Sequence, residues 1–163
     1  MTWTKAFARQ AESDFETRDC LLRAGSLPQC HQLHYLQMAL EKLAKAHLIA
    51  GGSSPEDLSS SHVYISKPIP MIVREMLART PGQKDGWVVD AIRDLSRRIE
   101  LLAPAVRDGG RAPANCEYPW KAPDGSIKAP ADHDFGLDLV FEKAGVTMIK
   151  AARARARELA SAT

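Results

Sequence analysis

Four residues in the segment 29–50 carry side chains that can do chemistry. His34, Met38, Glu41 and Lys45 follow one another at spacings of three and four residues, so in a helix they share one face. If that face lines a cleft, His34 and Glu41 can bind a nucleotide or RNA beside Lys45, or act as general acid and base. The alternative is a polar stripe whose Glu–Lys pairs only stabilise the helix.

Basic side chains form a second candidate set. Lys150, Arg153 and Arg157 fall on one face of the last predicted helix, and Arg97 lies on the outer face of an earlier one. Each phosphate that such residues neutralise adds salt-dependent affinity for RNA or a nucleotide. The alternatives are a solvated, fraying C-terminus for the late residues and simple solvation for Arg97.

Two aromatic residues mark a third candidate, in a segment that is rich in Pro and Gly. Tyr118 and Trp120 lie close together in residues 115–120, which read Asn-Cys-Glu-Tyr-Pro-Trp. They can stack on a base or anchor a partner protein, and the alternative is that they cover the open end of a helical core.

Histidine and cysteine spacing gives little support to a metal centre. His31 and His34 are three residues apart, and His133 has an aspartate on each side, but the Glu-x-x-His arrangement of ferritin-like sites is absent. The three cysteines show no Cys-x-x-Cys spacing, so neither a disulfide framework nor a zinc knuckle is expected. We therefore expect no metal ion and no other cofactor.

The helices that must position these side chains are predicted by apolar residues that recur every three or four positions. The first carries a stripe from Trp3 to Leu22 and stops at Gly25. The second runs over 29–50 and should pack antiparallel to the first. Further helices are expected at about 54–57, 70–79, 88–102 and 137–160, the last with a bend or break at Gly145.

Residues 104–131 interrupt the helical pattern before the last helix. Their Pro and Gly content is too high for a continued helix, and Pro123-Asp124-Gly125 is a turn signal. A loop, or a small β-hairpin over about 118–128, is therefore expected. The predicted fold class is all-α: an up-down bundle of four to five helices, in one domain over 1–163, with this insertion before its last helix.

Composition narrows the class of protein further. With 163 residues, 45% of them hydrophobic and 26% charged, the chain can bury one continuous core. No apolar run approaches the roughly 20 residues of a membrane span, and the N-terminus does not resemble a secretory signal. We therefore expect a cytoplasmic protein without a membrane partner. A net charge of +2 is too small to indicate nucleic-acid binding by itself.

The first two predicted helices also resemble a known family. Residues 39–46 contain Ala39, Glu41, Lys42, Lys45 and Ala46, which match the Ala-x-Glu-Lys-x-x-Lys-Ala pattern often found in the second helix of HEPN domains. The segment Ala-Glu-Ser-Asp-Phe over 11–15, followed by a pair of leucines, is similar to the family's opening helix. The specific likeness covers about the first 50 residues, and beyond them only helix order and length agree.

This resemblance implies a four- or five-helix bundle, frequently a dimer, of the kind found in toxin–antitoxin, antiviral defence and RNA-processing systems. Catalytic HEPN members carry an arginine about four to six residues before a histidine in a late helix. None of the five histidines has an arginine at that distance, and the nearest, Arg23 before His31, is separated from it by seven residues. The resemblance therefore implies a member without the family's ribonuclease motif.

We expect from this a non-catalytic HEPN-like module that forms a homodimer and binds RNA, a nucleotide or a partner protein. One alternative is a divergent metal-independent ribonuclease. In it, His34 or His133 would take the 2′-hydroxyl proton and late-helix arginines would stabilise the phosphorane charge. A second alternative is a purely structural helical bundle that binds a partner protein.

Overall fold

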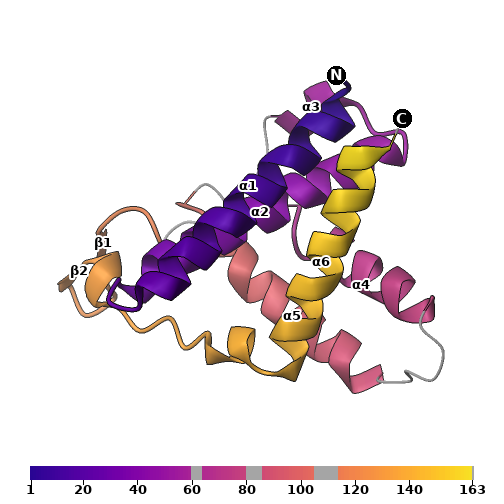
Figure 1. The fold of residues 1–163 in the computed structure, drawn as a ribbon. Coiled ribbons are helices and arrows are strands. Elements are labelled where there is room, and N and C mark those ends of the chain that lie inside the picture. The colour runs from indigo at the N-terminus through magenta and orange to yellow at the C-terminus, as the bar shows by residue number, and fades with distance from the viewer. Residues whose placement is uncertain (60–63, 80–85, 105–113, 163) are drawn as a thin grey trace.

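The chain folds into an all-α bundle, as the apolar periodicity predicts (Figure 1). The computed structural model describes residues 1–59, 64–79, 86–104 and 114–162. The predicted helix stop at 80–82, His62 and part of the predicted insertion lie outside these ranges. Within them lie six α-helices: α1 (Trp3–Ala24), α2 (Gln29–Ala50), α3 (Pro55–Ser59), α4 (Pro68–Ala78), α5 (Gly86–Glu100) and α6 (Lys143–Ser161).

The two longest helices, α1 and α2, form the antiparallel hairpin that the sequence predicts (Figure 1). The hydroxyl of Thr2 caps α1 by accepting from the backbone N–H of Lys5. α1 ends at Gly25, whose φ of 72° is left-handed and favours glycine. Between the helices, Lys42 Nζ lies 2.6 Å from Asp14 Oδ2.

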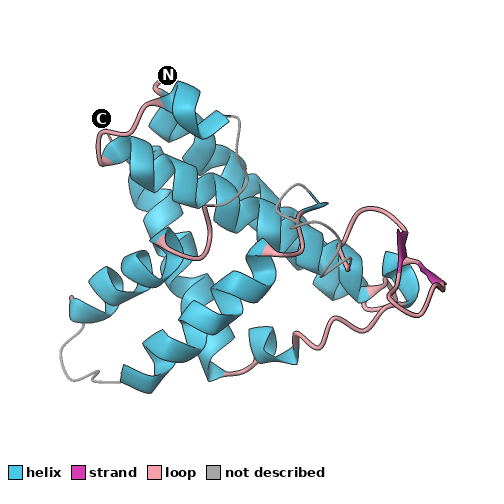
Figure 2. Ribbon diagram, turned by 180° about the vertical axis from the view of Figure 1, so that it is seen from behind, coloured by secondary structure: helices cyan, strands magenta, loops and turns pink. Residues whose placement is uncertain are grey.

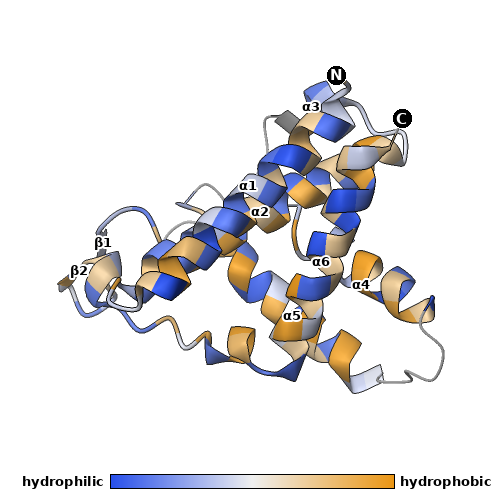
Figure 3. Cartoon of the chain, viewed as in Figure 1, coloured by the Kyte–Doolittle hydropathy of each residue, from blue (hydrophilic) through white to orange (hydrophobic). Residues whose placement is uncertain are grey.

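A continuous apolar core joins α1, α2, α4, α5 and α6. On α1 the predicted stripe holds for Ala11 and Phe15, whereas Trp3 is 59% exposed and stacks on Phe7 in the first turns. Hydrophilic residues dominate the visible face of α1 (Figure 3). The leucine stripe of α2 and the seam of α5 are buried at Leu33, Leu36, Leu40, Leu43, Val88, Ile92, Leu95 and Ile99.

No helix in the described ranges is long and apolar enough to cross a membrane.

The insertion before the last helix contains the small β-hairpin expected there. Strands β1 (Trp120–Lys121) and β2 (Ile127–Lys128) pair antiparallel. The turn between them has Gly125 at φ 85°, and the Asp124 carboxylate accepts from the Ser126 N–H at 2.9 Å. The hairpin lies near the α1–α2 connection, at the end of the molecule away from both termini (Figures 1 and 2).

The predicted last helix is split in two. A 3-10 turn over Asp138–Phe141 precedes α6, and the break falls just before Lys143. Gly145 explains how the two parts fit, because a Cβ there would overlap the carbonyl oxygens of Leu139 and Val140. The glycine therefore marks a close backbone approach in the first turn of α6, and the break predicted at Gly145 falls before Lys143 instead.

Candidate functional site

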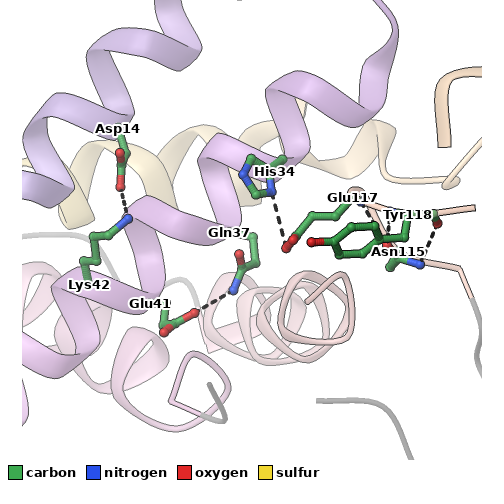
Figure 4. Close-up of polar contacts among 8 residues, drawn as sticks. All are labelled: Asp14, His34, Gln37, Glu41, Lys42, Asn115, Glu117 and Tyr118. Atoms are coloured by element: carbon green, nitrogen blue, oxygen red, sulfur yellow. Dashed lines mark hydrogen bonds and ion pairs between the residues drawn. The ribbon is translucent and has the colours of Figure 1, made fainter. Parts of the chain in front are cut away.

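A cleft of about 490 Å³ opens between α2, the end of α5 and the segment 114–118. Its apolar walls are Met38, Ala103, Pro104 and the ring of Tyr118. Its polar groups come from α2 and from the segment 114–118 (Figure 4). These groups are His34, Gln37, Glu41 and Glu117.

His34 and Glu117 face each other across this cleft (Figure 4). His34 Nδ1 lies 3.7 Å from Glu117 Oε1, and the two side chains are 29% and 31% exposed. The pair is ionic only when the imidazole is protonated. Sequence spacing singled out His34 but missed Glu117, whose only signal was its place beside the aromatic residues of the Pro-rich segment.

Asn115 fixes the backbone that carries Glu117 and Tyr118. Its side chain is 1% exposed, and its Oδ1 accepts from the N–H groups of Glu117 and Tyr118 at 2.9 and 2.7 Å. Its Nδ2 donates to the Tyr118 carbonyl at 3.0 Å. The N–H of Cys116 donates to the carbonyl of Leu102, just after α5, so the segment is tied to the bundle. Tyr118 is 62% exposed.

Glu41 and Lys45 form a buried row with Gln37 along α2. Gln37 Nε2 donates to Glu41 Oε2 at 2.9 Å, and Lys45 Nζ lies 2.9 Å from Glu41 Oε1. Both side chains of the ion pair are 6% exposed, and the Lys45 ammonium also lies 5.8 Å from the centre of the Tyr64 ring. Glu41 therefore forms the floor of the cleft, and its charge is compensated by Lys45.

The aromatic residues of the insertion divide between two roles. Trp120 is 8% exposed, and its ring lies edge-on to that of His133 at 4.9 Å. The His133 ring lies in turn edge-on to Phe135 at 4.8 Å. Trp120 thus anchors the hairpin and His133 is held between two rings, whereas Tyr118 presents its ring to the cleft.

The predicted basic residues lie away from this cleft. Arg153 donates to Asp19 Oδ1 at 2.6 Å and to the Phe15 carbonyl at 3.1 Å, both on α1. Arg157 Nε lies 3.9 Å from Glu12 Oε1, also on α1. Lys150 lines a different pocket, and Arg97 is exposed on α5. In the described structure, Arg153 and Arg157 thus contact α1 and do not line the cleft with His34.

Among the described residues, neither a metal-binding cluster nor a reactive thiol lies at the cleft. No group of three or more His, Cys, Asp or Glu side chains among the described residues is placed to hold a metal ion. Asp134, beside His133, accepts from the Gly136 N–H at 2.7 Å. Burial, with smaller contributions from Cys30 and Glu117, raises the pKa of the Cys116 thiol to about 12, so Cys116 is not a nucleophile at neutral pH.

The charge of the cleft determines what it can bind. Lys45 compensates Glu41, which leaves the partly exposed Glu117 carboxylate beside His34 and Tyr118. No lysine or arginine is among the lining residues that the structure describes. A phosphate would therefore meet a carboxylate here, whereas a cationic group would be attracted.

Comparisons of the chain with protein-family models, with curated proteins and with solved structures find no match.

Proposed function

We propose that the chain is a non-catalytic HEPN-like helical module whose cleft binds a cationic side chain of a partner protein. One observation carries the proposal: Asn115 holds the backbone that places the Glu117 carboxylate and the exposed Tyr118 ring at the mouth of an apolar-walled cleft. A carboxylate beside an aromatic ring is the combination that recognises a cation.

Arginine fits this site better than lysine. Its planar guanidinium stacks on an aromatic face and can donate two parallel hydrogen bonds to one carboxylate. The cleft volume of about 490 Å³ lies within the range of roughly 300–1,000 Å³ that is usual for ligand sites. It can hold an arginine together with an apolar neighbour against Met38 and Pro104. A partner segment of that composition is therefore the expected occupant.

The same contacts support a binding role over catalysis. A metal-independent ribonuclease needs a proton acceptor and a cation that reach one phosphate. His34 faces Glu117, and His133 lies between Trp120 and Phe135. Arg153 is engaged with Asp19. RNA cleavage by the purified chain that is lost in His34→Ala or His133→Ala would establish the ribonuclease alternative instead.

Homodimer formation and a role in toxin–antitoxin or defence systems belong to the same proposal, and both rest on the HEPN resemblance. The expected result of sedimentation equilibrium is twice the chain mass of 17.9 kDa. A monomer at all concentrations would remove the dimer from the proposal. It would leave the proposed arginine site standing, because His34, Glu117 and Tyr118 come together within one chain.

The cleft is tested by NMR titration of isotope-labelled protein with N-acetyl-arginine amide. We expect the amide signals of His34, Glu117 and Tyr118 to shift. Glu117→Gln removes the charge with little change in shape and should abolish these shifts. Glu16→Gln is the matched control, because Glu16 is exposed on α1 and does not line the cleft.

Two results would contradict the proposal. One is an arginine probe that shifts no cleft residue in the wild-type protein. The other is a short RNA or a nucleotide that shifts the same amides when the arginine probe does not. The second result would make a nucleic acid or nucleotide the ligand, in line with the other reading of the HEPN resemblance.

A further inference from the structure

Arg18 is a buried cation on α1 for which the described structure provides no hydrogen bond or ion pair. The residue is 4% exposed, and its Nε is buried without a hydrogen-bond partner. Its guanidinium carbon lies 6.0 Å from the centre of the Phe141 ring, at the limit of a cation–π contact. A buried charge in such surroundings is unfavourable unless a counter-charge pairs with it.

Arg18 lines a pocket of about 300 Å³ between α1, the 3-10 turn at 138–141 and α6. Val140, Phe141 and Ile149 supply its apolar wall. Phe141 is 50% exposed although it borders the pocket. The volume is at the lower end of the range for small-molecule sites, so the pocket suits a compact ligand with an apolar part.

Positive charge exceeds negative charge in this pocket. Lys150 and Arg153 of α6 join Arg18, and Asp19 is the carboxylate among the described lining residues. Asp19 already pairs with Arg153, with Nη2 and Oδ1 2.6 Å apart. Burial lowers the pKa of Arg18, Asp19 opposes that effect and Arg153 adds to it. Asp19 therefore offsets only part of the cost of burying Arg18, because its carboxylate already pairs with Arg153.

We propose that this pocket binds a small organic anion, with a phosphate or carboxylate group on Arg18 and an apolar group against Phe141 and Ile149. The anion supplies the counter-charge that Arg18 lacks, and Lys150 at the pocket edge adds a second contact. The apolar wall selects an organic anion over an inorganic one. Among the described residues, the pocket and the cleft have no lining residue in common, so this proposal does not depend on partner binding in the cleft.

Four matched probes test the proposal by isothermal titration calorimetry of the full chain. Phenyl phosphate and benzoate have both the charge and the ring, inorganic phosphate has only the charge, and phenol has only the ring. We expect phenyl phosphate or benzoate to bind at least about tenfold more tightly than the other two, and the better of them identifies the head group.

Three substitutions locate the site. Arg18→Met keeps the length of an unbranched side chain and removes the buried charge, so it should fold and lose at least about tenfold in affinity. Lys150→Met should weaken binding a few-fold. Arg157→Met is the control, because Arg157 is on the same helix but its side chain is 72% exposed and lies near Glu12, outside this pocket. It should bind as the wild type does.

The proposal is overturned if neither phenyl phosphate nor benzoate binds the wild-type chain at millimolar concentration. It is also overturned if inorganic phosphate binds as tightly as they do. Undiminished binding by folded Arg18→Met would have the same consequence. Should Arg18→Met not fold, equal affinities of Lys150→Met and Arg157→Met for the organic anion would still contradict the location of the site.

Discussion

Asn115 is the residue whose loss should disturb the cleft most. Asn115→Ala removes one acceptor and one donor that hold the backbone of Glu117 and Tyr118. We expect a loss of about 1–3 kcal/mol in the free energy of unfolding, because buried backbone groups lose their partners. Urea denaturation measures this loss. The arginine-dependent NMR shifts should disappear as well.

Asn115→Asp provides the matched comparison. It keeps the acceptor for the N–H groups of Glu117 and Tyr118 but loses the donor to the Tyr118 carbonyl. Its stability should lie between those of the wild type and Asn115→Ala. An Asn115→Ala variant as stable as the wild type would show that the segment is held by other contacts.

Cys116 gives the protein a measurable dependence on alkaline pH. Its pKa is raised from 9.0 to about 12, mainly by burial. The stability that the neutral thiol contributes is therefore fully present below pH 9 and is lost as pH rises towards 12. We expect the stability advantage of the wild type over Cys116→Ala to shrink by about 2 kcal/mol between about pH 8 and 10.5.

Chemical denaturation at a series of pH values measures this difference, and the comparison with Cys116→Ala removes the effect of other titrating groups. A thiol reagent at about pH 8 provides an independent check. Cys20 is exposed and should react in the folded protein, whereas Cys30 and Cys116 are buried and should react only after unfolding. Rapid labelling of Cys116 in the native state would contradict its high pKa.

The spacing of residues in the sequence predicts some residues of the cleft and of the pocket. It does not predict the residue that gives each of them its charge. Helical periodicity placed His34 and Glu41 on one face, but it could not show which loop residue would meet them, and Glu117 does. Arg18 does carry a signal in the sequence. It lies three residues after Phe15 and four before Leu22, at the gap in the apolar stripe of α1, and a charged residue at a core position indicates a pairing requirement.

At the scale of elements, the junction between the 3-10 turn and α6 depends on Gly145. A Cβ at this position would overlap two backbone carbonyl oxygens, which cannot move away without shifting the turn. Gly145→Ala should therefore cost about 1–3 kcal/mol, the usual range for overpacking. Thermal unfolding measures the loss.

Gly86→Ala is the control for this prediction. Gly86 is the first residue of α5, and a Cβ there meets nothing within 4 Å. Alanine favours helix over glycine, so the variant should be as stable as the wild type or more stable by up to about 1 kcal/mol. If both glycine substitutions have the same effect, the close contact at Gly145 does not constrain the fold.

Most of the helices could be predicted from local signals in the sequence. The stop of α1 at Gly25 and the bounds of α2 were predicted because turn residues and apolar spacing agree there. Helices α4 and α5 begin two residues earlier than predicted, at Pro68 and Gly86. Proline is favourable in the first turn, where its missing N–H is not needed. The sequence predicts a bend or break at Gly145, but its place just before Lys143 depends on the packing of the 3-10 turn against the first turn of α6.

At the scale of the whole molecule, the α1–α2 hairpin separates two sites of opposite charge. α2 contributes to the cleft with Glu117, and α1 contributes to the pocket with Arg18. The net charge of +2 gave no indication of either site, because the opposite charges nearly cancel in the total. Residues 114–118 reach α2, and α6 reaches α1, only in the tertiary structure. This distribution of charge could therefore not be derived from periodicity or composition.

Our proposal that the cleft recognises the positive charge of a partner side chain can be tested with a neutral ligand of nearly the same shape. The most direct measurement compares the affinities of the wild-type chain for N-acetyl-arginine amide and for N-acetyl-citrulline amide, which has nearly the same shape without the charge. We predict that the arginine compound binds at least about tenfold more tightly, a difference of about 1.4 kcal/mol. Equal affinities, or tighter binding of the citrulline compound, would contradict the claim.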